Sequence, residues 1–176
     1  DAPGVAYSAG ALGVRTNVKI VPVADIHTDV VMARVREFSP DLGLSLAAPI
    51  LRRPLFSIPR LGTLNLHKGR LPDFRGMPPA FWELWHDRQE VGCSVHWVDD
   101  KLDTGALVAS GTVKRSTYST LRGLQLALDE VGVGLMKAVV RDVLDGHSEA
   151  KPQPSGGRTF RKPTLAQNAA LTRRMQ

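Results

Sequence analysis

Cysteine is almost absent from this sequence of 176 residues, and the presence of only Cys93 excludes an intrachain disulfide. Such a composition suits a reducing compartment. Cys93 lies in the pattern Val-Gly-Cys-Ser-Val-His, which is typical of a strand and indicates a buried thiol rather than a nucleophile. The sequence also shows no signal-peptide pattern and no apolar run long enough to span a bilayer. We therefore expect a cytoplasmic protein without a membrane partner.

Metal-binding patterns and acidic residues are also scarce. The histidines are scattered, and none stands at metal-ligand spacing from His67, so we expect no metal. Lys and Arg outnumber Asp and Glu by 23 to 17, which gives a formal net charge of +6 and favours an anionic partner. Much of the excess lies in the tail, where such residues are usually solvated, so we do not expect a nucleic-acid partner. These tail residues are Arg158, Arg161, Lys162, Arg173 and Arg174.

Alternating patterns predict one α/β domain. Short β-branched or apolar runs predict strands at 18–23, 42–47, 62–66, 92–98 and 106–113. Helical patterns are found at 5–12, 29–38, 78–87, 117–144 and 163–175. Three prolines within 49–59 predict an irregular or short 3₁₀ connection. This alternation indicates an open sheet whose ligand crevice lies outside the carboxyl ends of the strands.

Several details of these elements can be predicted. The run 42–47 is almost continuously apolar, so we expect a buried parallel strand. The strands 92–98 and 106–113 are expected to form a hairpin with a long loop. Pro78 is expected in the first turn of its helix, where it costs no hydrogen bond. Ser116 or Thr117 is expected to cap the longest helix, 117–144.

The polar residues Asn65 and His67 stand two apart at the end of a predicted strand, so both side chains share one face. An Asn can donate to an oxygen on which negative charge develops, and a His can carry or move a proton near neutral pH. The Leu-Pro and Arg-Gly pairs of 71–76 break regular structure directly afterwards, and an acidic turn follows later in the chain, at 99–105. The first run is therefore expected to be an ordered loop over the strand end.

Together these segments resemble the folate-dependent formyltransferase family, which includes glycinamide ribonucleotide, methionyl-tRNA and nucleotide-sugar N-formyltransferases. Asn65, His67 and Asp103 match the three polar positions of the family pattern. Its framework is matched by Leu71, Pro72, Arg75, Gly76 and Gly105. The resemblance covers about residues 40 to 113. It departs at 68–70, where Lys-Gly-Arg stands and many members have Pro-Ser-Leu or Gly-Ser-Leu.

The resemblance implies an open, mostly parallel Rossmann-like sheet that is incomplete at its N-terminus, because family members begin with a further strand, helix and strand. Residues 1–147 would form this shortened domain, and 148–176 a loop-rich basic tail with a terminal helix. The resemblance also implies 10-formyltetrahydrofolate as cosubstrate, with its pterin held by backbone groups of two segments. These are Pro49, Ile50 and Leu51, and Val98, Asp99 and Asp100.

Formyl transfer assigns a role to each polar residue of the pattern. Asn65 would donate to the oxyanion, and His67 would stabilise the same charge when protonated or take the amine proton when neutral. Asp103 would orient His67 or relay the proton through water. Plainer alternatives are a structural His67, and an Asp103 that caps a turn with Gly105. Arg75 would fix the loop through backbone carbonyls or contact a phosphate, whereas His96 is assigned to packing or support.

The acceptor is expected to be a small anionic amine, and a nucleotide-activated amino sugar is favoured. Lys68 and Arg70 are the residues expected to meet it. Three alternatives remain: hydrolysis of the formyl group by water, a non-catalytic folate- or partner-binding module, and tRNA formylation. The last would require a further C-terminal RNA-binding domain. The long apolar helix 117–144 can serve a homodimer as readily as the core.

Overall fold

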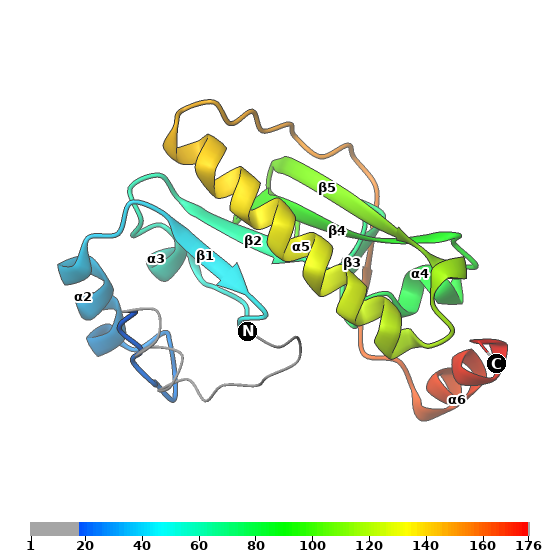
Figure 1. Cartoon of the computed structure of the whole chain (residues 1–176). Helices are drawn as coiled ribbons and strands as arrows, with labels where there is room; N and C mark the ends of the chain where they lie inside the picture. Colours follow the sequence, from blue (N-terminus) through cyan, green and yellow to red (C-terminus); the bar gives the residue numbers. More distant parts are fainter. Residues whose placement is uncertain (1–17, 176) are drawn as a thin grey trace.

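The computed structural model describes residues 18–175, and its centre is an open four-stranded sheet in the order β1-β2-β4-β5 (Figure 1). The strands are β1 (Gly43–Leu46), β2 (Thr63–His67), β4 (Glu90–Trp97) and β5 (Leu107–Lys114). The α/β class is confirmed. The expected parallel pairing is found between β1 and β2, whereas β2–β4 and β4–β5 are antiparallel. The predicted hairpin of 92–98 and 106–113 is confirmed by the second of these antiparallel pairs.

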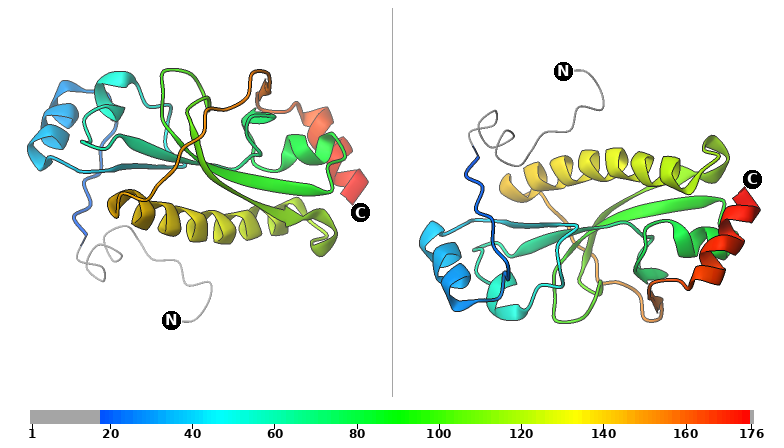
Figure 2. Two further views of the ribbon diagram at one scale, coloured as in Figure 1. Left: turned by 90° about the horizontal axis from the view of Figure 1, so that it is seen from above. Right: turned by 90° about the horizontal axis from the view of Figure 1, so that it is seen from below.

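One long helix, α5 (Leu121–Leu144), covers one face of the sheet, and the other helices lie on the opposite side (Figure 2). Its apolar face, at the helical spacing that predicted the helix, packs against strands β2, β4 and β5. The buried members of this face are Leu124, Ala127, Leu128, Gly132, Met136 and Val139. The helix begins later than expected because residues Arg115–Thr117 form a 3₁₀ turn. Its cap is therefore Thr120, whose side chain accepts the Gly123 N–H, and neither Ser116 nor Thr117.

The tail returns to the centre of the molecule. Strand β6 (Arg158–Phe160) pairs in parallel with β3 (Phe74–Gly76), which follows the loop after His67. Helix α6 (Leu165–Met175) then lies against α4 (Phe81–Trp85). Its Leu171 is buried in the same hydrophobic cluster as Phe81 and Leu84. The helix was predicted within 163–175, but β6 was not predicted. This strand puts Phe160 into an aromatic stack with Phe74 and Trp82.

The first part of the described chain departs most from expectation. Helix α2 (Asp29–Phe38) has the predicted bounds and is capped by Thr28. The strand predicted at 18–23 is wrong, because this segment pairs with no strand of residues 18–175. Strand β1 is likewise not fully buried: Ser45 is 6% exposed, but Leu44 and Leu46 on the other face are 48% and 52% exposed. No strand within 18–175 pairs with its outer edge. The helix predicted at 5–12 lies outside the described residues.

Two further elements differ from expectation. The proline-rich connection contains a single helical turn, α3 (Arg53–Phe56). Helix α4 starts at Phe81 rather than at Pro78, because Ala80 adopts a left-handed backbone conformation with φ of 63° and ends the preceding loop. Among residues 18–175, no helix combines the length and apolarity that crossing a membrane requires.

Candidate active site

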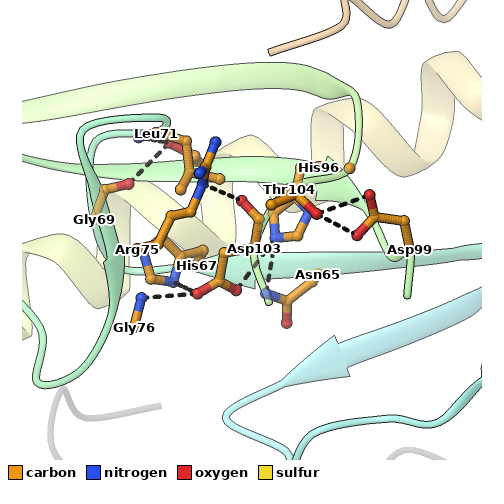
Figure 3. Close-up of polar contacts among 12 residues, drawn as sticks. Asn65, His67, Gly69, Leu71, Arg75, Gly76, His96, Asp99, Asp103 and Thr104 are labelled. Atoms are coloured by element: carbon orange, nitrogen blue, oxygen red, sulfur yellow. Dashed lines mark hydrogen bonds and ion pairs between the residues drawn. The ribbon is translucent and has the colours of Figure 1, made fainter. Parts of the chain in front are cut away.

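Polar side chains meet where the end of β2 faces β4 (Figure 3). Asn65 and His67 lie on β2, and the strand register puts His96 of β4 directly opposite Asn65. Asp103 reaches the same place from the loop that joins β4 to β5. Asn65, His67 and Asp103, predicted to act together, are thus brought together. Residue His96, which sequence reasoning had assigned to packing or support, is a fourth member of the cluster.

His67 is 7% exposed, and its ring is held from one side by the backbone. Its Nε2 lies 2.7 Å from the carbonyl oxygen of Phe74, and because a carbonyl only accepts, Nε2 carries the donated hydrogen. The other ring nitrogen, Nδ1, then faces Asp103 Oδ2 at 3.5 Å. Gly69 allows this arrangement, since a Cβ there would collide with both the Phe74 oxygen and the His67 ring.

Asp103 joins three segments through one carboxylate. Its Oδ2 accepts the backbone N–H of Gly76 at 2.9 Å, and its Oδ1 lies 3.7 Å from His96 Nε2. The residue has a left-handed backbone with φ of 54°, which Asp tolerates better than most residues. Gly105 is required beside it, because a Cβ there would collide with the carbonyl of Trp97. The turn therefore aims the carboxylate between two imidazole rings.

The ring of His96 determines how the Asn65 amide is turned. His96 Nδ1 lies 2.8 Å from its neighbour's carbonyl, that of Trp97, and must donate to it. In the neutral ring Nε2 is then an acceptor, and it receives an N–H of the Asn65 amide at 3.1 Å. The second N–H of that amide remains available as a donor. Strand pairing was the missing information, because the sequence alone does not say that His96 stands opposite Asn65.

The protonation of His67 and Asp103 follows from their burial and their contacts. Burial lowers the pKa of His67, although the charge of Asp103 acts in the opposite direction. Burial also works to raise the pKa of Asp103, but His96, His67 and the Gly76 N–H together outweigh it and hold that pKa below its ordinary value. A neutral imidazole nitrogen and an ionised carboxylate then face each other. Both groups are hydrogen-bond acceptors, so the space beside them suits a hydrogen-bond donor.

Arg75 fixes the acidic turn through backbone groups, as one of its two predicted roles required. Its Nε donates to the carbonyl of Asp103 at 3.2 Å, and its Nη1 donates to that of Gly156. Its Nη2 donates to Gln153, whose own amide donates to the carbonyls of Asp103 and Gly105 at 3.0 and 2.8 Å. Gln153 carried no sequence signal, because its contacts depend on how the tail folds back.

The two segments predicted to hold a pterin are tied together at the surface. An ion pair joins Arg53, two residues after Leu51, to Asp100 of the acidic turn. The side chain of Ile50 is 71% exposed on one segment, and that of Leu102 is 40% exposed on the turn. The Thr104 hydroxyl donates to the Asp99 carboxylate, and lies 2.7 Å from Oδ1 and 2.9 Å from Oδ2. The two segments therefore lie close together at the surface, and their role in holding a pterin stays a prediction.

The two cations predicted to meet an acceptor have separate surroundings. The ammonium of Lys68 forms an ion pair with Asp129 of α5, away from the predicted trio. The side chain of Arg70 is exposed, while its backbone N–H donates to Glu83. Within residues 18–175, no group of three His, Cys, Asp or Glu side chains is arranged to hold a metal ion.

The chain matches known proteins over most of its length. Residues 11–140 match the protein-family profile described as Formyl transferase. A methionyl-tRNA formyltransferase from Halorhodospira halophila is 32% identical over 128 residues, which make up 72% of this chain and 41% of that protein. The chain therefore spans about two fifths of the length of this curated relative.

Solved structures share the fold at lower identity. The formyltransferase PseJ from Anoxybacillus kamchatkensis, in complex with UDP-4,6-dideoxy-4-formamido-L-AltNAc and tetrahydrofolate, has a TM-score of 0.64 and 23% identity over 79% of this chain and 70% of that chain. A sugar N-formyltransferase from Shewanella has a TM-score of 0.68 and 18% identity over 84% and 64%. At these identities the likeness is one of fold.

Proposed function

The chain belongs to the formyl transferase family, and from this membership we propose that it moves a formyl group from 10-formyltetrahydrofolate to a primary amine. The observation that carries the proposal is the convergence of Asn65, His67 and Asp103 from two separate segments. The backbone of 49–51 and 98–100 would hold the folate, which supplies the formyl carbon. Exposure of Ile50 on the first segment, and of Leu102 just after the second, supports that assignment.

Formyl transfer consists of three chemical events. The amine nitrogen forms a bond to the formyl carbon, the bond from that carbon to the folate nitrogen breaks, and one proton moves from the amine to the departing nitrogen. Negative charge develops on the formyl oxygen between these events. The second N–H of the Asn65 amide would donate to this oxygen, and a preorganised donor of this kind typically contributes about 3 kcal/mol.

His67 and Asp103 would handle the proton. With Nε2 committed to the Phe74 carbonyl, the Nδ1 lone pair is the free acceptor of the neutral ring. An amine nitrogen placed beside Nδ1 and Asp103 Oδ2, which lie 3.5 Å apart, would donate one N–H to each of them. His67 would take the proton, and the carboxylate beside it would stabilise the resulting imidazolium. The same proton can then return to the departing nitrogen.

An amino-sugar nucleotide is the acceptor that we favour. The net charge of +6 suits a phosphorylated molecule, and PseJ was solved with a UDP-sugar. The exposed guanidinium of Arg70 would meet the phosphates, and Lys68 would join it by leaving Asp129. Replacing Arg70 with Ala should therefore raise the acceptor KM well above any change in the folate KM. Lys68→Ala should have a smaller effect, because its charge is already paired.

A second acceptor is favoured by a separate observation. The relative that is 32% identical is a methionyl-tRNA formyltransferase. If the acceptor is a charged tRNA, turnover should fall steeply as salt increases, since several phosphate contacts would be screened together. A nucleotide sugar with two phosphates should show a much weaker dependence.

The test is to incubate the intact protein with 10-formyltetrahydrofolate and each candidate acceptor, and to quantify tetrahydrofolate and formylated product by mass spectrometry. We expect tetrahydrofolate release only when an amine is present, in a 1:1 ratio with formyl-amine. Release without an acceptor, at the same rate, would identify a hydrolase. Folate binding without release, in all mixtures, would leave the non-catalytic module as the correct description.

A further inference from the structure

Glu83 of α4 is a buried carboxylate that the proposed reaction does not use. Its side chain is 1% exposed, although charged residues are rarely buried without a partner. One oxygen, Oε1, accepts two backbone hydrogens, the N–H of Arg70 at 3.1 Å and that of Gly92 at 3.0 Å. Arg70 belongs to the loop after His67, and Gly92 belongs to β4. A single carboxylate oxygen thus ties the loop to the central sheet.

From this oxygen, hydrogen bonds lead to the ring of His67. The carbonyl of Arg70 accepts the N–H of Phe74 at 2.9 Å, and the carbonyl of Phe74 accepts the His67 Nε2 hydrogen at 2.7 Å. Glu83, Arg70 and Phe74 therefore form one frame that fixes the position of the Phe74 carbonyl. That carbonyl in turn sets both the tautomer and the orientation of the imidazole.

A second tie holds the same loop and does not depend on charge. The hydroxyl of Ser94 accepts the N–H of Leu71 at 3.2 Å and donates to the carbonyl of Gly69 at 2.9 Å. The loop is therefore fixed to β4 at two points, one through a neutral hydroxyl and one through an ionisable group. Only the tie through Glu83 can change strength with pH.

The surroundings of Glu83 allow it to exchange a proton. A small cavity with room for one water molecule is lined by Glu83 together with residues of the loop and of β3. Burial raises the pKa of Glu83 to about 7, against the opposing effect of the two N–H groups and of Arg70. Two other titratable residues, Lys68 from the loop and Arg75 from β3, line the same cavity, and the thiol of Cys93 from β4 lies close enough for the charge of Glu83 to raise its pKa. Lys68 is itself paired with Asp129 of α5.

We propose that Glu83 is a positioning residue for the formyl-transfer site, and that its ionised carboxylate draws the Arg70 loop into the position that orients His67. Charge-assisted hydrogen bonds are shorter and about twice as strong as neutral ones, so loss of the charge loosens the frame. The role in catalysis rests on the proposed function, but the frame itself does not. The two can therefore be tested separately.

The frame is tested by NMR on the intact ¹⁵N-labelled protein. The amide proton shifts of Arg70 and Gly92 should move together with pH, with one midpoint at about 7, because both amides share Oε1. Glu83→Gln should abolish this common transition, whereas the control Glu90→Gln, at the start of β4, should keep it. Amides that do not titrate in the parent protein, or that titrate equally in Glu83→Gln, would overturn the proposal.

The effect on catalysis is tested in the same variants with the formyl-transfer assay. In the parent protein kcat should rise through the NMR midpoint, and in Glu83→Gln this inflection should be missing while the folate KM stays within about twofold. Glu83→Ala should lower kcat roughly tenfold, with partial recovery in Glu83→Gln. A titrating frame in a protein that never transfers formyl groups would refute the proposed function and leave the frame intact. Transfer whose pH profile is the same in the parent and Glu83→Gln would refute the positioning role.

Discussion

Asp103 is the residue on which the separate segments of the site converge. It accepts from Gly76 and faces the rings of His67 and His96, while its own carbonyl is held by Arg75 and Gln153. This much backbone support is more than a turn cap needs. A carboxylate held this firmly suits a task in which position and charge both matter.

Asp103→Asn is expected to separate charge from position. The Asn oxygen can still accept the Gly76 N–H, so the turn should keep its shape. The amide nitrogen then takes the place of Oδ1, opposite His96 Nε2, and the change removes the negative charge that stabilises the imidazolium of His67. We expect kcat to fall by roughly 10²–10⁴, with KM values nearly unchanged. Steady-state kinetics beside the exposed control Asp73→Asn measures this, and a loss below tenfold would count against a catalytic Asp103.

Glu83 is expected to make stability depend on pH. Because its pKa in the folded protein is about 7, against an ordinary value of 4.5, the folded protein keeps a proton that the unfolded chain releases between these values. The unfolding free energy should therefore fall as pH rises through this window, by up to about 3 kcal/mol. Glu83→Gln should lack this decrease. Urea denaturation at about pH 5 and about pH 8 compares the two proteins, and parallel curves would contradict the expectation.

At the scale of elements, the start of α5 is fixed by a single side chain. Thr120→Ala removes the hydroxyl that accepts the Gly123 N–H, and the loss of such a cap costs about 1 kcal/mol. Thr117→Ala is a matched control, because Thr117 lies in the 3₁₀ turn before the helix and does not cap it. Urea denaturation should show a lower midpoint with unchanged slope for Thr120→Ala alone. Equal midpoints for the two variants would show that the cap contributes little.

How far the elements could be predicted depended on whether a local pattern carried the information. The stripe of α5, the bounds of α2 and the β4–β5 hairpin follow from spacing, so the sequence was sufficient. The start of α4 depends on the left-handed Ala80, which no residue preference announces. The segment 18–23 has strand composition but no partner within the described residues, and a strand requires one.

Site residues, too, could be predicted only where a local sequence pattern carried the information. The motif residues were found because their order and spacing form a pattern. Glu83 and Gln153 were missed, and His96 was assigned only to packing or support, because each gains its place from pairing or packing across the chain. His96 stands opposite Asn65 only in the folded sheet, and Gln153 reaches the acidic turn only once the tail has returned. The one signal for Glu83 in the sequence was its position within an otherwise apolar helical pattern.

At the scale of the whole molecule, the division into a domain of 1–147 and a tail of 148–176 remains a proposal about sequence regions, and the contacts join the two parts closely. Strand β6 pairs with β3, and Gln153 contacts the acidic turn. Arg174 of α6 lies over the ring of Trp85, 4.8 Å from its centre. The tail is therefore attached to the segment whose Phe74 carbonyl holds His67, and to the turn that carries Asp103. Its loss should disturb the site as well as the surface.

Phe160 tests whether tail and sheet unfold together. Its ring stacks on Trp82 at 5.1 Å and on Phe74 at 5.5 Å, so Phe160→Ala removes contacts on both sides while leaving the backbone pairs of β6 in place. Because the ring is only partly buried, we expect a loss of about 2 kcal/mol, less than that for a core Phe. Leu165→Ala is the control: the side chain is 89% exposed, so its removal should cost below about 0.5 kcal/mol.

If the tail belongs to the cooperative unit, tryptophan fluorescence and far-UV circular dichroism should shift to the same lower denaturant midpoint in Phe160→Ala. Separate midpoints for the two probes would mean that the tail opens on its own, and the carbonyl of Asp103 would then lose Gln153 and keep only Arg75.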